Sequence, residues 1–372
     1  MKFCFFGEIS GALKGKTKGG GELQVALLAR ALAIEGHEVV IIDPFSVESF
    51  ITIEGVKLIT VPNWNKGIGG IRMFLYRIPA LWKIFAKQNA DFYYVRMRSY
   101  LHLIPYIVSK KTGGKFIQAI ACDLDVLSVR EKFKYDYKAS FKLFKFLTVY
   151  LPNDLVFNYL LKRADYVILQ HAGQLLRSTS IYGKMVIFAN IIDCSNLPVV
   201  KNTTKNYFIH VGDLTMLKGS DNLYQLIKII DKKNSIIIVG EPKDSKSEII
   251  FKKLSTMENV VIKGRLSHNE TLQLIANSKA LINTSNYEGF PNIFLEAWAT
   301  RVPVISLKVN PGNVFNKYYL GVYCESQLNK MKMCIESEEI ANIDRSRLIS
   351  YVCEFHEFNS AGDRFLKTIN NA

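Results

Sequence analysis

The stretch INTSNYEGFPNIFLEAWATRVPVIS, residues 282–306, joins two short apolar runs through a turn and a helical segment. Apolar runs of this length are typical of buried strands, and two parallel strands need a crossover of about a dozen residues or more. Pro291 suits the first helical turn, because its φ is fixed and its missing N–H would be unpaired there anyway. We therefore predict a helix from near Pro291 to about Thr300, within a β-α-β unit.

Short apolar runs alternate with helical patterns along the rest of the chain as well, which favours parallel sheets covered by helices. One such helix is expected after Gly20, with apolar residues at helical spacing and Gly36 at its end. The strands that this alternation predicts are KFCFFG (2–7), EVVIID (38–43), KLITV (57–61), DFYYVRM (91–97), KFIQAIA (115–121), DYVILQ (165–170), NYFIHVG (206–212), SIIIVG (235–240), VVIKG (260–264), ALINTS (280–285) and PVISL (303–307).

The length of 372 residues suits two domains of ordinary size. The polar, aperiodic segment at 191–205 is the predicted linker between them. We predict an α/β fold of two Rossmann-like domains that face a cleft, at 1–190 and 206–355, with ligands at the carboxyl ends of the strands.

The composition excludes several classes of protein. With 49% hydrophobic and 22% charged residues the chain is typical of a soluble globular protein, and no apolar stretch reaches the roughly 18 residues of a membrane span. The first apolar run, before Glu8, is too short for the core of a signal peptide. The six cysteines are scattered without metal-type spacing, which indicates reduced cytosolic thiols rather than a zinc site.

The net charge of +15 is concentrated in the first half. Residues 1–190 contain 26 Lys and Arg against 14 Asp and Glu, a balance of +12, and the remainder contains 22 against 19, a balance of +3. Two basic segments in the first half, 65–88 and 130–163, interleave lysine and arginine with aromatic and aliphatic residues. Such helices can bury one face in the core and lay the other on anionic lipid. Pro79 and Pro152 are expected to interrupt or kink them.

Two glutamates flank the predicted helix start. Glu296 falls four residues after Asn292 and therefore on the same helical face, where a carboxylate can accept hydrogen bonds from both hydroxyls of a ribose. Glu288, on the preceding loop, would reach the reacting end of the same ligand, while the first N–H groups of the helix hold a diphosphate between the two. Each glutamate by itself is more often a solvated residue, so the indication comes from the pair and its Gly-Phe-Pro turn.

This region resembles the E-x7-E segment of the large retaining glycosyltransferase family with the GT-B fold, the glycosyl transferases group 1, which elongates bacterial polysaccharides and glycolipids. The resemblance implies that residues 356–372 form a closing helix that packs back on the first domain. The other segments that are similar to this family are GGGELQVALLARALAIEGHEVVIID (19–43), ADYVILQHAGQLL (164–176), FANIID (188–193), HVGDLTMLKGSDNL (210–223), VVIKGRLSHNETLQLIANSKALINTS (260–285) and FNSAGDRFLKTI (358–369).

The resemblance also implies roles for individual residues. Glu296 would bind the ribose hydroxyls, Glu288 the donor sugar, and Lys218 the donor phosphates, where a cation stabilises the charge of the leaving diphosphate. The residues that we predict to be catalytic are Glu288, Lys218 and Asp123. The donor-binding residues that we predict are Gly19, Gly20, Gly212, Lys218, Arg265, Gly289, Phe290, Asn292, Ile293 and Glu296, with the backbone of 290–293 on the diphosphate.

One departure from the family pattern concerns charge. Asp213 stands where many relatives carry arginine, and a carboxylate there would repel a diphosphate. We expect its side chain to turn away or another cation to take the place of the arginine. The candidate cations are Arg265, Lys14, Lys16 and Lys18.

A second departure is the absence of the family's histidine near the donor sugar, because the segment FIQAIACDLDVLS at 116–128 contains none. Asp123 or Asp125 is expected to supply a polar contact in its place. We interpret His102 and His171 as structural or surface residues. The Asp-Leu-Asp triplet also matches the acidic motif of metal-dependent glycosyltransferases of another fold, but the surrounding pattern favours a metal-independent enzyme.

The expected protein is therefore a retaining glycosyltransferase that moves a sugar from a UDP- or GDP-linked donor, without a cofactor or a divalent metal. The acceptor would be a glycan or a lipid-diphosphate-linked oligosaccharide of bacterial surface polysaccharide biosynthesis. We expect a cytoplasmic protein, peripheral on the inner face of the cytoplasmic membrane through its basic first half, and no nucleic-acid partner. The alternatives are a catalytically inactive nucleotide-sugar or glycan-binding protein, a nucleic-acid binder and a non-hydrolysing sugar-nucleotide epimerase.

Overall fold

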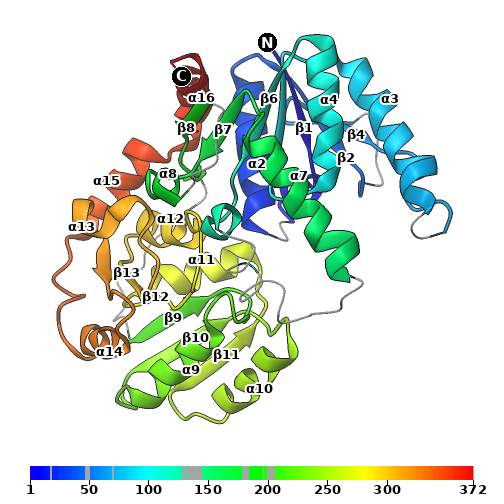
Figure 1. Ribbon diagram of the computed structural model, residues 1–372. Helices are drawn as coiled ribbons and strands as arrows, with labels where there is room; N and C mark the ends of the chain where they lie inside the picture. Colours follow the sequence, from blue (N-terminus) through cyan, green and yellow to red (C-terminus); the bar gives the residue numbers. More distant parts are fainter. Residues whose placement is uncertain are drawn as a thin grey trace. The chain divides into compact units, whose positions relative to one another are not determined.

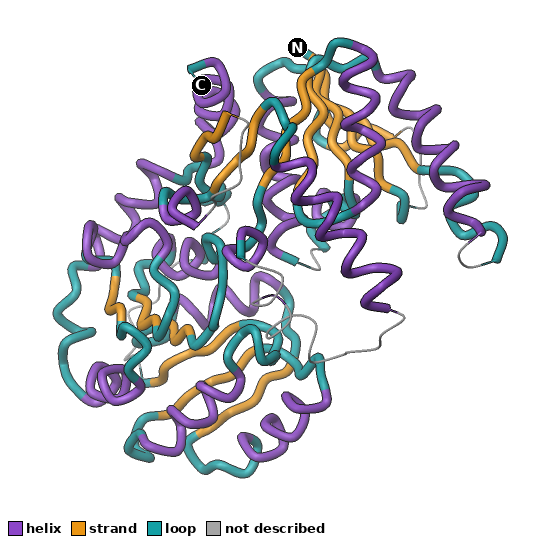
Figure 2. Tube along the Cα trace, viewed as in Figure 1, coloured by secondary structure: helices purple, strands orange, loops and turns teal. Residues whose placement is uncertain are grey.

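The computed structural model (Figure 1) shows strands and helices alternating along the chain (Figure 2). The residues that it describes are 1–16, 19–46, 51–68, 71–127, 132, 145–177, 184–195, 197–198 and 206–371. Lys18, the first part of the basic segment 130–163 (residues 130–131 and 133–144) and most of the predicted linker lie outside the described residues.

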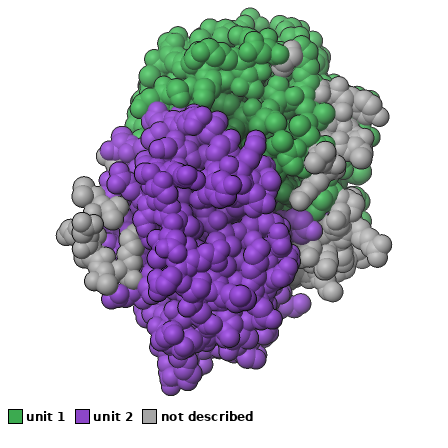
Figure 3. Space-filling view, turned by 90° about the vertical axis from the view of Figure 1, so that its left-hand side faces the viewer, with its two compact units in different colours: residues 1–127, 142–193, 358–372 green, residues 128–141, 194–357 purple. Residues whose placement is uncertain are grey.

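The described residues divide into two compact units (Figure 3). The first holds residues 1–127, 145–193 and 358–371, and the second holds Lys132 and residues 194–357. Each unit is built on its own parallel sheet.

The sheet of the first unit has eight strands in the order β3-β4-β2-β1-β5-β6-β7-β8, and only β3 runs antiparallel to its neighbour. All six strands that the sequence predicts in this half are present. The short edge strands β3 and β8 are additions that the apolar pattern did not predict. The strands are β1 (Lys2–Phe6), β2 (Glu38–Asp43), β3 (Ile51–Ile53), β4 (Val56–Thr60), β5 (Phe92–Arg96), β6 (Lys115–Ala119), β7 (Tyr166–Leu169) and β8 (Lys184–Ile187).

Helices cover both faces of this sheet because successive side chains of a strand point to opposite faces. Phe3 and Phe5 of β1 pack in one core with α2 (Gly20–Ile34) and α16 (Ala361–Asn370). Cys4 and Phe6 pack in the other with α3 (Ile78–Gln88), α4 (Leu103–Thr112) and α7 (Leu151–Leu161). The remaining helical segments are α1 (Ser10–Leu13), α8 (Gly173–Arg177), the 3₁₀ turns η2 (Tyr100–His102), η3 (Asp123–Val126) and η8 (Phe358–Ser360), and the π turns η1 (Met73–Arg77) and η6 (Phe146–Tyr150).

Helix α16 is the closing helix that the sequence resemblance implies. Its Phe365 is fully buried, and its ring centroid lies 6.4 Å from that of Phe3, 6.3 Å from that of Tyr94 and 5.1 Å from that of Phe188. These three rings belong to the sheet of the first unit or to the residue after it. The end of the chain therefore returns to the unit in which the chain begins.

The sheet of the second unit has six parallel strands in the order β11-β10-β9-β12-β13-β14. Helices α9, α10 and α14 share a core with one face, and α11 and α12 contact the other. All five predicted strands are present, and the sequence missed only the three-residue β14. The elements are β9 (Tyr207–Val211), α9 (Ser220–Ile229), β10 (Ser235–Val239), α10 (Ser245–Leu254), β11 (Val260–Gly264), α11 (His268–Ala276), β12 (Leu281–Asn283), α12 (Asn292–Ala299), β13 (Val304–Ser306), η7 (Pro311–Asn313), α13 (Val314–Tyr318), β14 (Gly321–Tyr323), α14 (Leu328–Glu336) and α15 (Arg345–Phe355).

In both sheets the strand order reverses next to the first strand of the unit. The reversal lies between β1 and β5 in the first unit and between β9 and β12 in the second. Ligands of doubly wound sheets bind outside the carboxyl ends of the strands at this switch point. The predicted α/β fold of two Rossmann-like domains is confirmed. None of the helices in the described part of the chain is both long and apolar enough to cross a bilayer.

Candidate active site

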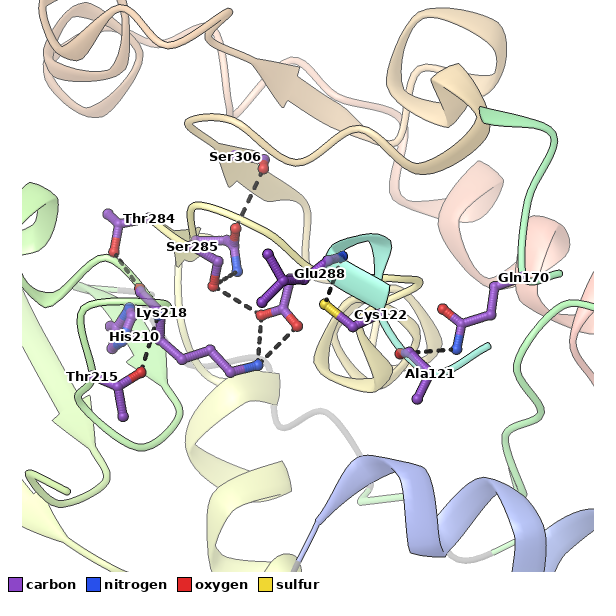
Figure 4. A network of polar contacts seen from close by, with 12 residues as sticks. Ala121, Cys122, Gln170, His210, Thr215, Lys218, Thr284, Ser285, Glu288 and Ser306 are labelled. Atoms are coloured by element: carbon purple, nitrogen blue, oxygen red, sulfur yellow. Dashed lines mark hydrogen bonds and ion pairs between the residues drawn. The ribbon is translucent and has the colours of Figure 1, made fainter. Parts of the chain in front are cut away.

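A lysine and a glutamate meet at the switch point of the second unit. Lys218 follows β9 and Glu288 follows β12, and these two strands are neighbours in the sheet. The Lys218 Nζ atom lies 2.6 Å from Glu288 Oε1 and 2.8 Å from Oε2 (Figure 4). Two residues 70 positions apart in the sequence therefore form one bidentate ion pair at the edge where a doubly wound sheet binds its ligand.

The loops that carry these two side chains are held together by a close backbone approach. Gly219 has a φ of +69°, and a Cβ atom there would lie 1.9 Å from the carbonyl oxygen of Thr284. Only glycine fits this position. The Thr284 hydroxyl donates to the Gly219 carbonyl at 3.1 Å, and the Asn286 side-chain amide donates to the Met216 carbonyl at 2.7 Å. The lysine loop is thus fixed against the glutamate loop.

Glu288 is held from its other side by buried polar residues. The Ser285 hydroxyl lies 2.8 Å from Glu288 Oε1, and Asn283 donates its side-chain amide to the same hydroxyl at 3.2 Å (Figure 4). Ser306, on the neighbouring strand, lies 3.5 Å from Asn283 Oδ1. The side chain of Glu288 is 14% exposed and that of Lys218 is 38% exposed. The glutamate side chain is therefore the more buried and the more tightly held of the two, and the lysine side chain is the more exposed.

His210 of β9 lies beside the base of the Lys218 side chain (Figure 4). Burial, together with the charge of Lys218, lowers the pKa of His210 to about 4. Its Nδ1 lies 3.2 Å from the Ile282 carbonyl, and its buried Nε2 has no hydrogen-bond partner among the described residues. The imidazole is consequently neutral at physiological pH and adds no charge beside the lysine.

Helix α12 begins at Asn292 directly after Pro291, which caps it in an extended conformation. The sequence prediction of its bounds is therefore correct to within one residue at each end. The N–H of Phe294 donates to the Pro291 carbonyl at 3.1 Å. The N–H groups of Asn292 and Ile293 come before this bond, in the first turn of the helix. These two predicted donor-binding residues stand where a helix N-terminus can bind an anion.

Gly289 and Phe290 lie in the turn before the helix, and both are buried. The ring of Phe290 packs against the rings of Trp298 and His356, with centroids 6.2 Å and 4.8 Å apart. The side chain of Phe290 thus belongs to the core, and only its backbone can reach a ligand.

Glu296 lies one helical turn into α12, with its side chain 14% exposed. Burial raises its pKa to about 7 from an ordinary value of 4.5. His268, at the start of α11, places Nδ1 3.9 Å from Glu296 Oε1. Burial lowers the pKa of His268, so this imidazole is neutral at pH 7 and does not form an ion pair with the carboxylate.

A second charged cluster follows the carboxyl ends of β9, β10 and β11. Arg265 donates from Nη2 to Asp213 Oδ1 at 3.1 Å, and Lys243 Nζ lies 3.9 Å from the same oxygen. Glu241 Oε2 lies 4.0 Å from Arg265 Nε. The aspartate that departs from the family pattern is therefore neutralised by Arg265, one of the cations that the sequence analysis named as a replacement. Gly212 directly follows β9, has a φ of +146° and precedes Asp213.

Asp123, the remaining catalytic candidate, lies in the first unit and has two buried partners. Its Oδ1 atom lies 3.0 Å from His171 Nε2 and accepts a hydrogen bond from Gln174 Nε2 at 2.9 Å. Asp123 follows β6, whereas His171 and Gln174 follow the neighbouring strand β7. His171, which we interpreted as a structural or surface residue, is buried beside Asp123, because the carboxyl ends of adjacent parallel strands meet at one edge. This rule about adjacent strand ends could have predicted from the sequence that His171 lies near Asp123.

Asp125 does not share the environment of Asp123. Its Oδ1 lies 2.9 Å from Arg98 Nε, and its Oδ2 accepts hydrogen bonds from the N–H groups of Ala121 and Cys122. Asp154 binds the same arginine at 3.1 Å. Asp125 is therefore a structural residue, and the Asp-Leu-Asp triplet does not present two carboxylates to one ligand.

Gly19 and Gly20 also belong to the first unit. Gly19 caps α2 in an extended conformation, with a φ of −154° and open space around the position of a Cβ atom. No backbone strain requires glycine here. Lys14 and Lys16 lie on the preceding loop, in the same unit. Of the predicted residues, Gly212, Lys218, Arg265, Gly289, Phe290, Asn292, Ile293, Glu288 and Glu296 lie in the second unit.

A known protein family matches part of the second unit. Residues 198–333 match the family Glycosyl transferases group 1. This segment contains Lys218, Glu288 and Glu296, and the resemblance to the glycosyl transferases group 1 is confirmed for it. The uncharacterized glycosyltransferase MJ1059 of Methanocaldococcus jannaschii is 28% identical over 178 residues, which are 42% of this chain and 43% of that protein. The match thus spans less than half the length of this relative.

Solved glycosyltransferase structures share the whole fold. Sucrose-phosphate synthase from Thermosynechococcus elongatus is 15% identical, with a TM-score of 0.77 over 100% of this chain and 98% of that one. HepE from Anabaena, in complex with UDP and glucose, is 15% identical with a TM-score of 0.68 over 100% of both chains. The lipopolysaccharide outer core galactosyltransferase WaaB is 17% identical with a TM-score of 0.68 over 100% of this chain and 99% of that one. At these identities the likeness shows the fold, which is that of the GT-B glycosyltransferases.

Proposed function

We propose that this protein is a retaining glycosyltransferase that uses a nucleotide-activated sugar. The observation that carries the proposal is the arrangement at the switch point of the second unit. Lys218 and Glu288 meet there, and the N-terminus of α12 and Glu296 follow within eight residues of Glu288. A cation, a helix N-terminus and two carboxylates are the groups that a sugar diphosphate needs.

In the proposed reaction, the acceptor hydroxyl oxygen attacks the anomeric carbon from the face of the leaving group. The bond between that carbon and the phosphate oxygen breaks, and the hydroxyl proton passes to the departing phosphate oxygen. Lys218 and the N–H groups of Asn292 and Ile293 stabilise the diphosphate charge as it develops. Glu288 positions the sugar, and Glu296 accepts hydrogen bonds from the ribose. The rate enhancement then comes from positioning and electrostatics, without a protein nucleophile or a divalent metal.

UDP or GDP would be the nucleotide of the donor. The HepE complex with UDP and glucose supports UDP. The fold shared with WaaB supports an acceptor among surface glycans or lipid-linked oligosaccharides. A thermal-shift screen of nucleoside diphosphates and their sugars tests the donor. Donor binding should raise the melting temperature, and transfer or hydrolysis of the bound donor should follow. No stabilisation by any of them would contradict the proposal.

A binding protein without catalysis is the second candidate, and Asp213 favours it because this residue replaces a cation of the family. Such a protein would bind the donor without turnover. Measurement of nucleoside diphosphate release in the presence of bacterial lipid-linked acceptors separates the two. The ion pair of Asp213 with Arg265 removes the repulsion that the aspartate alone would cause.

We also propose that the first unit attaches to anionic membranes from the cytoplasmic side. Three apolar side chains are exposed in the region of η1: Ile71, which precedes this turn, and Phe74 and Leu75, which belong to it. The side chain of Phe74 is 72% exposed. Residues 61–90 contain five lysines and arginines and no acidic residue. Basic residues around exposed apolar ones suit an anionic bilayer surface. Co-sedimentation with anionic vesicles at low salt should retain the protein, and Phe74→Ser with Leu75→Ser should weaken the association.

A further inference from the structure

The positive charge of Lys218 is already matched in the ligand-free protein. Both carboxylate oxygens of Glu288 lie within 2.8 Å of Nζ, so a diphosphate that binds Lys218 must compete with this carboxylate. The inference below rests on the proposed function, in which Lys218 binds the donor phosphates and Glu288 the donor sugar. It concerns what the pair does before the donor arrives and after the sugar has left.

We propose that Glu288 makes the site prefer a nucleotide that carries a sugar over the bare nucleoside diphosphate. When the donor binds, Lys218 exchanges Glu288 for the phosphate oxygens. The carboxylate is then compensated by hydrogen bonds from the sugar hydroxyls. When the nucleoside diphosphate binds alone, the same exchange leaves Glu288 without a cation and beside a negatively charged phosphate. Binding of the bare nucleotide therefore takes the cation from Glu288 and gives this carboxylate no new partner, whereas the sugar of the donor does.

The geometry indicates which partner moves. Glu288 is held through Ser285, whose hydroxyl is 2.8 Å away and is itself fixed by the buried Asn283. Lys218 has its backbone N–H bonded to the Thr215 hydroxyl at 3.1 Å, but its side chain is 38% exposed (Figure 4). The lysine side chain consequently swings between carboxylate and phosphate, while the glutamate stays in place. His210 is neutral and cannot take over the role of the lysine as a cation.

The exchange has a consequence for turnover. Transfer removes the sugar from the donor and leaves the nucleoside diphosphate in the site. Without the sugar hydroxyls, Glu288 competes again with the phosphates for Lys218 and lowers the affinity of the site for the nucleoside diphosphate product. The same carboxylate that positions the sugar thus speeds the release of the nucleotide. A site without this glutamate would be more strongly inhibited by its product.

The test compares nucleotide affinities of the full chain by isothermal titration calorimetry with UDP, GDP and their sugars. Glu288→Gln keeps the shape of the side chain but removes the charge that binds Lys218. We expect it to bind the preferred nucleoside diphosphate about fivefold more tightly than the wild type, the equivalent of about 1 kcal/mol for a partly exposed pair. Affinity for the sugar-bearing donor should not rise by this factor, so the ratio of the two affinities should fall.

A matched control exists in the same unit. Lys232 and Glu258 form an exposed ion pair with Nζ 2.9 Å from Oε2, and they precede β10 and β11. The pair therefore lies at the amino ends of the parallel strands, at the opposite edge from Lys218. Glu258→Gln removes the same charge and breaks a lysine–glutamate pair there. Its nucleotide affinity should equal that of the wild type.

A double-mutant cycle makes the test specific, because the gain in Glu288→Gln must require the lysine. Adding Lys218→Met to Glu288→Gln should abolish the gain. Unchanged or weaker nucleotide binding by Glu288→Gln, with measurable binding by the wild type, would overturn this inference and leave the proposed function standing. Absence of binding by the wild type to every nucleotide and nucleotide sugar would overturn both.

Discussion

We expect Glu296 to link the pH dependence of stability to donor binding. Burial raises its pKa from 4.5 to about 7, which corresponds to about 3 kcal/mol at 1.36 kcal/mol per pH unit. The folded state holds the proton more tightly than the unfolded state. The resulting stabilisation is fully present below pH 4.5, and it is lost as the pH rises through 7. At pH 8 the neighbouring His268 is neutral, because burial lowers its pKa, and it provides no compensating positive charge.

Glu296→Gln replaces the carboxyl by a neutral group of the same shape. We expect the variant and the wild type to have equal free energies of unfolding at pH 4. At pH 8 the variant should be more stable by about 3 kcal/mol. The same variant should bind the nucleotide sugar roughly tenfold or more weakly, because charge-assisted hydrogen bonds to the ribose are lost. A carboxylate that costs stability while it supports binding is the expected signature of a functional residue.

The assay is urea unfolding at a series of pH values, followed by tryptophan fluorescence. Trp298 is buried in α12, two residues after Glu296, so a background with Trp64→Phe and Trp82→Phe reports on the second unit. The exposed Glu258→Gln serves as the control and should show no gain at pH 8. Equal stability of Glu296→Gln and the wild type at both pH values would refute the reasoning, as would a gain that is the same at pH 4 and pH 8.

Three further predictions concern the contacts that form the site. Lys218→Ala should weaken donor binding roughly tenfold, since a charge-assisted contact to phosphate is lost, and unchanged affinity in calorimetry would contradict its assignment. Gly219→Ala should lower the melting temperature and abolish donor binding, because its Cβ would clash with the Thr284 carbonyl. Gly36→Ala is the control for backbone strain alone, because Gly36 has a φ of +81° and open space around it. Near-equal melting temperatures of these two variants would argue against the clash. His171→Leu should lower turnover and leave nucleotide affinity unchanged, since its partner Asp123 lies in the first unit, and His171→Gln should restore part of the turnover by donating to the same carboxylate. Full activity of His171→Leu would leave the pair without a role in the reaction.

Periodicity predicted the fold well because parallel strands are buried on both faces and read as continuous apolar runs. The strands that it missed are three or four residues long and lie at or next to an edge of a sheet. In β8, for example, only Val186 is buried. The two proline-interrupted segments also behave as expected from the chemistry of proline. Pro79 and Pro152 lie in the first turns of α3 and α7, directly after the π turns.

The site was less predictable than the fold, because it depends on pairs of side chains from distant loops. The sequence indicates that Lys218 and Glu288 both face the ligand, but nothing in it shows that they bind each other across 70 positions. The same holds for Asp123 and His171, which are 48 positions apart. Adjacent strand ends limit which loops can meet, whereas the side-chain partners are decided by loop conformation. From the sequence, only the rule that adjacent parallel strands end at the same edge of a sheet could have predicted that His171 lies near Asp123.

Two ion pairs at the strand ends of the second unit show how an aspartate can stand in the proposed anion-binding region. Lys218 is paired with Glu288, and Arg265 is paired with Asp213, so both cations have a carboxylate partner when no ligand is bound. A diphosphate brings its own negative charge and can take the place of a carboxylate as the partner of a cation. The arginine of the family would leave an excess of positive charge in the empty site, which attracts any polyanion. With Asp213 in its place, we expect a lower affinity for every anion and a larger part in recognition for the proposed contacts of Glu288 and Glu296 with the two sugars of the donor.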